Sequence, residues 1–128
     1  MAYLIGNRIG LSYDRYYEAR KDWGMMVNRT RDCTRQFYGY VADSAIGDEA
    51  MKWCVGYVYC CKAALRWQQD VDKDMTGFLS EAELAALRGV QHMPNYCMDR
   101  LTDQIALAKN RGLIDTIQVR DDDVDDPT

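Results

Sequence analysis

A stripe of apolar and aromatic side chains with helical spacing dominates the first third of the sequence. Its members recur at alternating steps of three and four residues and are Tyr16, Ala19, Trp23, Met26, Thr30, Cys33, Phe37 and Tyr40. This heptad spacing is typical of a helix that packs lengthwise against other helices. Charged residues such as Arg15, Lys21 and Asp32 fall outside the stripe. The sequence therefore predicts one long helix, which we expect to begin at Ser12 with Asp14 in its first turn.

A second helix is expected to begin at Asp48 and Glu49 and to run to about Gln69. Its middle, from Trp53 to Cys61, is apolar on nearly every side, which indicates burial in a larger assembly. This is the longest uninterrupted apolar run, and a helix that spans a bilayer needs about 20 apolar residues. The run is therefore too short to cross a membrane.

Capping signals predict three shorter helices toward the C-terminus. Ser80 and Glu83 form a capping box, so a third helix is expected from Ser80 to Arg88, with Gly89 at its end. Pro94 predicts the first turn of a fourth helix. The expected apolar face and end of this helix are Met98, Leu101, Ile105, Ala108 and Gly112. A fifth helix is expected to begin at Asp115. Because no stretch alternates with period two, we predict an all-α fold of long antiparallel helices with shorter C-terminal ones.

The net charge of −4 comes from the end of the chain. Residues 115–128 hold six Asp and one Arg, a net charge of −5, so the residues before them carry +1. No basic stripe is present, and no nucleic-acid partner is expected. The acidic end is most simply a solvated tail.

Cysteine and histidine usage argues against catalysis. The cysteines form no CxxC pair, and no signal peptide precedes them, which favours a reducing compartment. They are Cys33, Cys54, Cys60, Cys61 and Cys97. Cys60 and Cys61 point to different sides of a helix, and we interpret them as small core residues. His92 is the only histidine, and a lone histidine is more often structural than a general base. We expect no enzyme and no catalytic residues.

Residues 72–83 match the loop of an EF-hand. Oxygen donors fall at the positions that coordinate Ca²⁺, and Gly77 lies where the loop turns sharply. The candidate ligands are Asp72, Asp74, Thr76, the carbonyl of Phe78, Ser80 and Glu83. The pattern therefore predicts a Ca²⁺-binding loop at residues 72–83.

The same residues have a second interpretation. EF-hands usually come in pairs, and the sequence holds no second loop of this form. Ser80 and Glu83 are fully explained as a helix cap, and Asp72 and Asp74 as solvated loop acids. Both interpretations stay open at this point.

Two blocks of sequence resemble the bestrophin-like anion channels. Residues 12–24 read SYDRYYEARKDWG and residues 27–31 read VNRTR, which is similar to the family segment SYDRWWEARKLWG…VNxSR. The second block, residues 77–84, 92–94 and 112–115, resembles the family's cytosolic helices in order and spacing. Relatives share a similar Gly-Phe-apolar-Ser/Thr run without Asp72 and Asp74, which favours the capping interpretation.

The resemblance implies a pentameric, mostly helical subunit whose cytosolic helices surround a vestibule below a membrane pore, with chloride as the permeant ion. In that family the hydrophobic neck lies on the membrane helix just before the first block. Residues 1–117 are therefore expected to be a partial domain with the membrane neck helix missing, and residues 118–128 an acidic tail. The resemblance also implies attachment to a membrane through missing segments, with these helices at its cytosolic or stromal face.

One residue of the ion pathway follows from the resemblance. Members of the family narrow the cytosolic exit with an apolar side chain two residues after the acid that caps the fifth helix. Asp115 and Thr116 place Ile117 at this position. A ring of five such side chains could impede hydrated anions by dewetting. The alternative for Ile117 is an ordinary core residue that staples the helix cap.

Three function classes thus remain: a channel subunit, a calcium-binding module with one EF-hand loop at residues 72–83, and a non-catalytic helical interaction protein. A channel subunit should self-associate, whereas a calcium module should change its melting temperature with the ion. An interaction protein should do neither without its partner.

Overall fold

The computed structural model describes residues 1–67 and 71–114. This part of the chain forms α1 (Ala2–Tyr40), α2 (Ser44–Leu65), α3 (Asp72–Met75), α4 (Glu81–Arg88) and α5 (Met93–Asn110). Within these residues there is no β-strand, and the one extended pairing is an isolated bridge between Thr76 and Leu79. The predicted all-α fold class is confirmed.

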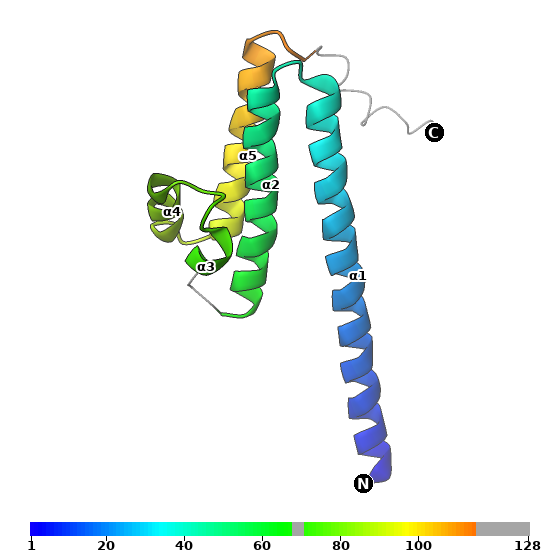
Figure 1. Ribbon diagram of the computed structural model, residues 1–128. Helices are drawn as coiled ribbons and strands as arrows, with labels where there is room; N and C mark the ends of the chain where they lie inside the picture. Colours follow the sequence, from blue (N-terminus) through cyan, green and yellow to red (C-terminus); the bar gives the residue numbers. More distant parts are fainter. Residues whose placement is uncertain (68–70, 115–128) are drawn as a thin grey trace, which may run out of the picture.

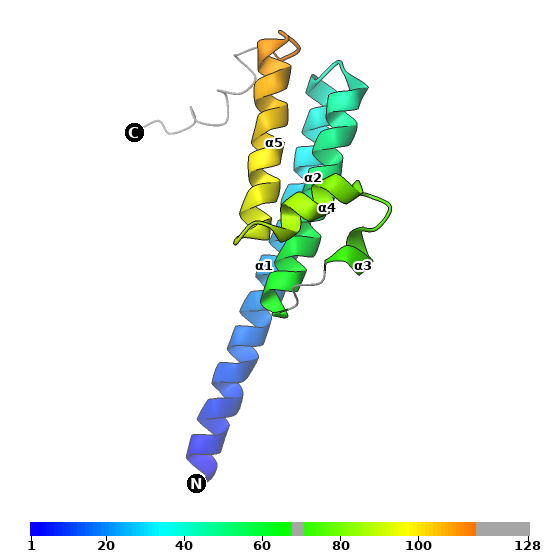
Figure 2. The same cartoon turned by 90° about the vertical axis from the view of Figure 1, so that its left-hand side faces the viewer.

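Helix α2 lies between the other two long helices (Figures 1 and 2). The chain reverses after α1 and again between α2 and α5, so α1 and α5 both run antiparallel to α2. The short helices α3 and α4 lie beside the C-terminal half of α2. The N-terminal half of α1 extends past all the other helices, and nothing in the described chain lies beside it.

Two apolar clusters hold the helices together. The first lies where α2, α3, α4 and α5 meet and is formed by Trp53, Cys60, Ala63, Val71, Met75, Leu79, Leu84, Leu87 and Cys97. Trp53 meets Tyr96 edge to face, with the ring centroids 5.8 Å apart. The second joins the end of α1 to α2 and α5 and is formed by Phe37, Val41, Ile46, Ala50, Cys54, Leu101 and Ala108. Helix α2 contributes to both clusters and is the centre of the fold.

The hairpin between α1 and α2 is tight. Gly47 faces the ring of Tyr38, and a Cβ at position 47 would lie 3.2 Å from the ring. The Tyr38 hydroxyl donates a hydrogen bond to the carboxylate of Asp48. This bond favours the protonated phenol and raises the pKa of Tyr38. Gly47 thus lets the ring come close to the backbone of α2 at the point where the two helices approach each other.

The predicted starts of the first two helices were wrong. Ser12 does not cap α1, which begins ten residues earlier; its hydroxyl donates to the Arg8 carbonyl 2.9 Å away. Helix α2 begins at Ser44 because Asp43, not Asp48, caps it by accepting from the Ala45 N–H. It ends at Leu65, before Gln69, and Trp67 then adopts a left-handed φ of 55°.

The capping predictions near the C-terminus were right for α4. Ser80 and Glu83 form the expected capping box. Pro94 lies in the first turn of α5, and Gly112 follows its end with a left-handed φ of 68°, which glycine adopts at little cost.

The apolar face predicted for α5 was only half right. Leu101 and Ala108 are buried, but Met98 and Ile105 are exposed, and Cys97 is buried instead. Helix α5 packs against α2 alone along most of its length, so only a narrow stripe of it is covered.

The described helices of the chain do not combine the length and apolar character that a membrane crossing requires. The fifth predicted helix, at Asp115, and the acidic tail at residues 118–128 lie outside the described residues.

Candidate functional site

The N-terminal part of α1 carries a large exposed surface of apolar and aromatic side chains. Every residue from position 1 to 25 is exposed. We call the following set the α1 aromatic surface: Tyr3, Leu4, Ile5, Ile9, Leu11, Tyr13, Tyr16, Tyr17, Trp23 and Met25. So many large apolar side chains exposed on one helical segment are typical of a site where a protein meets another protein or a lipid. This surface is therefore the main candidate site for an interaction.

The heptad stripe of the sequence divides at the middle of α1. Tyr16, Ala19 and Trp23 are exposed, whereas Cys33 is half-buried and Phe37 is buried against α2. The helix is thus covered by its own chain only along its C-terminal part. From Met26 to Phe37 the predicted stripe faces the rest of the chain, but Tyr40, its last member, is exposed and the stripe before Met26 is uncovered in the described chain.

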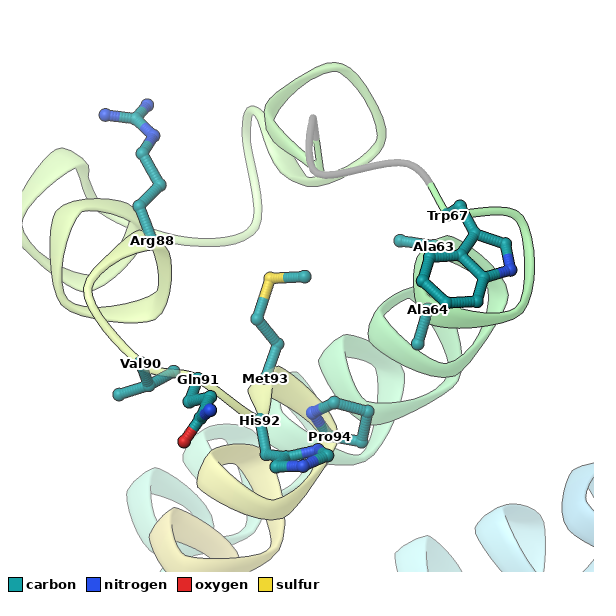
Figure 3. A pocket seen from close by; sticks show the side chains of 9 residues that line it. All are labelled: Ala63, Ala64, Trp67, Arg88, Val90, Gln91, His92, Met93 and Pro94. Carbon is teal, nitrogen blue, oxygen red and sulfur yellow. The ribbon is translucent and has the colours of Figure 1, made fainter.

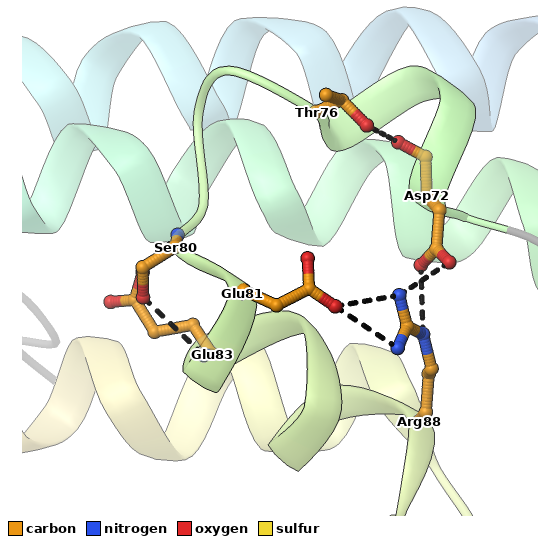
Figure 4. A network of polar contacts seen from close by, with 6 residues as sticks. All are labelled: Asp72, Thr76, Ser80, Glu81, Glu83 and Arg88. Carbon is orange, nitrogen blue, oxygen red and sulfur yellow. Dashed lines mark hydrogen bonds and ion pairs between the residues drawn. The ribbon is translucent and has the colours of Figure 1, made fainter.

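The candidate calcium ligands lie on two sides of the α3–α4 connection (Figure 4). Asp72 opens α3, and its carboxylate accepts from Arg88 Nη2 at 2.5 Å and from Nε at 3.1 Å. The Thr76 hydroxyl donates to the Asp72 carbonyl 2.5 Å away. On the other side, the N–H and the hydroxyl of Ser80 each donate to Glu83 Oε2 at 2.8 Å.

Helix α2 supplies a lysine to each of the other two candidate carboxylates, those of Asp74 and Glu83. Asp74 Oδ2 lies 2.6 Å from Lys62 Nζ, and Glu83 Oε1 lies 2.6 Å from Lys52 Nζ. Desolvation raises the pKa of Glu83, but the hydrogen bonds from Lys52 and Ser80 outweigh it and hold the pKa below its ordinary value. These contacts anchor α3 and α4 to α2.

The three candidate carboxylates thus pair with three different cations and do not converge on one point. Phe78 is exposed and follows Gly77, whose φ is 101°. Among residues 1–67 and 71–114, no group of three or more Asp, Glu, His or Cys side chains lies close enough together to hold a metal ion. The geometry favours the capping interpretation of this segment.

Titration with Ca²⁺ tests this interpretation. We expect no saturable heat by calorimetry up to millimolar Ca²⁺, because binding would have to break the ion pairs of Asp72, Asp74 and Glu83. Asp48→Asn, an acid outside the loop, is the matched control for Asp72→Asn. Saturable heat that Asp72→Asn removes and Asp48→Asn retains would instead establish the EF-hand.

A cavity of about 570 Å³ lies between the end of α2 and the α4–α5 connection (Figure 3). Met93 points into it, and its wall includes Trp67 and His92. Arg88 also lines it, but the guanidinium is held by Asp72 and Glu81. His92 is exposed at the N-cap position of α5, where its side chain makes no capping hydrogen bond. The described residues that line the cavity include no Asp or Glu.

Sequence reasoning missed two close pairs of thiols. Cys54 Sγ lies 3.8 Å from Cys33 Sγ, and Cys60 Sγ lies 3.6 Å from Cys97 Sγ. The members of each pair are more than 20 positions apart in the sequence, so no local motif reveals them. Cys60 is buried, as interpreted from the sequence, while Cys61 is half-buried.

Comparison with known proteins identifies the family. A family model described as bacterial and fungal bestrophin protein matches residues 1–124. The chain belongs to the bestrophin family. The match includes all of α1 with its aromatic surface, as well as the four later helices.

Curated relatives of this bestrophin chain are named as channels. The voltage-dependent anion channel-forming protein YneE of Escherichia coli O157:H7 is 25% identical over 117 residues, covering 91% of this chain and 38% of the relative. A voltage-dependent anion channel-forming protein of Nostoc sp. is 27% identical over 96 residues, covering 71% of this chain and 31% of the relative. The chloroplastic voltage-dependent chloride channel 1 of Arabidopsis thaliana is 25% identical over 113 residues, covering 85% of this chain and 28% of the relative.

This bestrophin chain therefore spans about a third of the length of the curated relatives that it matches. No solved structure gives a significant match. Ile117, the candidate pathway residue, lies outside the described residues together with Asp115 and Thr116.

Proposed function

We propose that this bestrophin chain forms the cytosolic part of an anion channel subunit, with its helices around a vestibule and chloride as the permeant ion. The observation that carries the proposal is the α1 aromatic surface. It lies within the segment that matches the bestrophin family, and the described residues of the chain do not cover it. The channel names of the relatives support the same assignment.

A homo-oligomer is the assembly that fits this surface best. Helix α1 has 39 residues, a length of about 58 Å at 1.5 Å per residue. Roughly its N-terminal half extends beyond the rest of the bundle, and a second copy of the chain offers the same heptad face. The number of subunits we propose is five, from the resemblance of residues 12–31 to the family segment.

Three exposed glycines leave the backbone of α1 open to another helix. A Cβ at Gly6, Gly10 or Gly24 would meet nothing within 4 Å in this chain. Glycine in a helix interior costs about 1 kcal/mol relative to alanine. Small residues let helix backbones approach closely, so these glycines are consistent with packing between subunits.

Ile117 is proposed as the apolar constriction of the cytosolic exit. The test places residues 1–124 in the corresponding region of the E. coli relative and measures chloride efflux from liposomes. We expect Ile117→Ala to change the efflux rate or the selectivity between anions, because a smaller side chain lowers a dewetting barrier.

Ile105→Ala is the matched control, since Ile105 lies partly exposed on α5. It should leave efflux unchanged. Equal efflux for Ile117→Ala and the parent chimera would contradict the assignment of Ile117. A chimera that assembles correctly but passes no anions would contradict the channel proposal itself.

A further inference from the structure

Two pairs of thiols connect α2 to its neighbours. Cys54 contacts Cys33 of α1, with the sulfur atoms 3.8 Å apart, and Cys60 contacts Cys97 of α5, with the sulfur atoms 3.6 Å apart. All four are free thiols. A disulfide bond has a length of about 2.05 Å, so small side-chain rotations, of less than about 2 Å at sulfur, would bring either pair to bonding distance.

The two pairs differ in their access to solvent. Cys60 and Cys97 are both 0% exposed, so an oxidant in solution reaches neither sulfur. Cys33 is half-buried, and its partner Cys54 is 5% exposed. Cys61 is also half-buried, but it contacts the hydroxyl of Tyr57 and not another thiol. Cys33 is therefore the cysteine that combines access to solvent with a thiol neighbour.

The contact between Cys33 and Cys54 also changes the pKa of the two thiols in opposite directions. The Cys54 thiol donates a hydrogen bond to the Cys33 sulfur. This bond lowers the pKa of Cys33 to about 7 even though burial opposes the shift. The same bond raises the pKa of Cys54, which keeps its proton. Since the thiolate is the nucleophile, Cys33 is the member that reacts first with an oxidant.

We propose that Cys33 and Cys54 are a site of reversible oxidation, where hydrogen peroxide forms a disulfide that cross-links α1 to α2. The Cys33 thiolate attacks one peroxide oxygen, the O–O bond breaks, and the departing hydroxide takes up a proton to leave as water, giving a sulfenic acid. The Cys54 sulfur then attacks the Cys33 sulfur, and the sulfenic oxygen leaves with the Cys54 proton as a second water. Two thiols thus lose two electrons to one peroxide, and exchange with a dithiol reverses the bond.

The cross-link has a mechanical consequence for the hairpin. It lies inside the covered part of α1, which begins at Met26, and close to the buried Phe37. A bond at this place fixes the direction in which the uncovered part of α1 leaves the bundle.

Peptide mapping of the purified chain tests the proposal. The chain is treated with increasing hydrogen peroxide, free thiols are blocked, and the unreduced protein is cut with trypsin and chymotrypsin. Cleavage then separates Cys54 from Cys60, so the two disulfides give different cross-linked peptides: residues 32–35 joined to 54–57, or residues 60–62 joined to 97–100. We expect the first product to form roughly tenfold faster than the second, and a dithiol to remove it.

The Cys54→Ala variant is the matched control. In this variant Cys33 loses the hydrogen bond that lowers its pKa, so it should react more slowly, carry the sulfenic or sulfinic acid and form no intramolecular cross-link. Cys60→Ala should leave the Cys33–Cys54 product unchanged. The oxidised wild type should melt at least about 5 °C higher than the reduced form, because the bond closes a loop. Absence of the Cys33–Cys54 product from the folded wild type, or earlier formation of the Cys60–Cys97 product, would overturn the proposal.

Discussion

Trp53→Ala should lower the free energy of unfolding by about 3 to 5 kcal/mol, a large part of the stability of a chain of this size. Trp53 is 2% exposed, and its ring lies against Tyr96 at the centre of the first apolar cluster. Its Nε1 also donates to Glu49 at 3.0 Å. Removing the ring leaves a cavity where α2, α4 and α5 meet and leaves Glu49 without this donor.

Urea denaturation followed by far-UV circular dichroism measures this effect. Trp67→Ala is the matched control, because Trp67 is 95% exposed just beyond the end of α2. The control should change the free energy of unfolding by less than about 0.5 kcal/mol. Equal losses for the two variants would show that the first cluster is not the main source of stability.

Trp23→Glu should weaken self-association of the chain about 30-fold or more, which corresponds to about 2 kcal/mol at a buried aromatic contact. Trp23 is the last aromatic residue of the heptad stripe before the covered part of α1, and it remains 38% exposed in the single chain. A carboxylate at this position would lose its hydration at the proposed contact between subunits. The folded state of one chain should change little, because Trp23 packs against no cluster within it.

Analytical ultracentrifugation in mild detergent, with chemical cross-linking, measures the assembly. Trp67→Glu serves as the control, since it adds the same charge at an exposed tryptophan outside α1. It should assemble like the wild type. A wild-type chain that stays monomeric at high concentration, or a Trp23→Glu variant that assembles normally, would contradict the role proposed for the α1 aromatic surface.

Features encoded by neighbouring residues could be predicted from the sequence. The capping box of Ser80 and Glu83 depends on two positions three apart, and the structure has it as predicted. The stripe on α1 was likewise found from its spacing. The predicted start of this helix was wrong because Ser12 fits both a cap and a helix interior, and the residues before Ser12 continue the helix.

Features that depend on distant residues could not be predicted. Nothing in the sequence connects Lys52 with Glu83 or Cys33 with Cys54, because these contacts exist only after α2 has packed against its neighbours. The EF-hand pattern illustrates the same limit. The loop has suitable residues at every position, yet Arg88, which lies after the pattern, and Lys62, which lies before it, pair with its two aspartates.

The contact between Tyr38 and Gly47 governs more than the turn in which it lies. Because α1 is about 58 Å long, a change of about 5° in the angle between the two helices would move its N-terminal end by about 5 Å. A Cβ at position 47 would lie 3.2 Å from the exposed Tyr38 ring, so either the ring must shift or the angle between the two helices must open. The absence of a side chain at position 47 thus allows the close approach of the two helices on which the position of the far end of α1 depends.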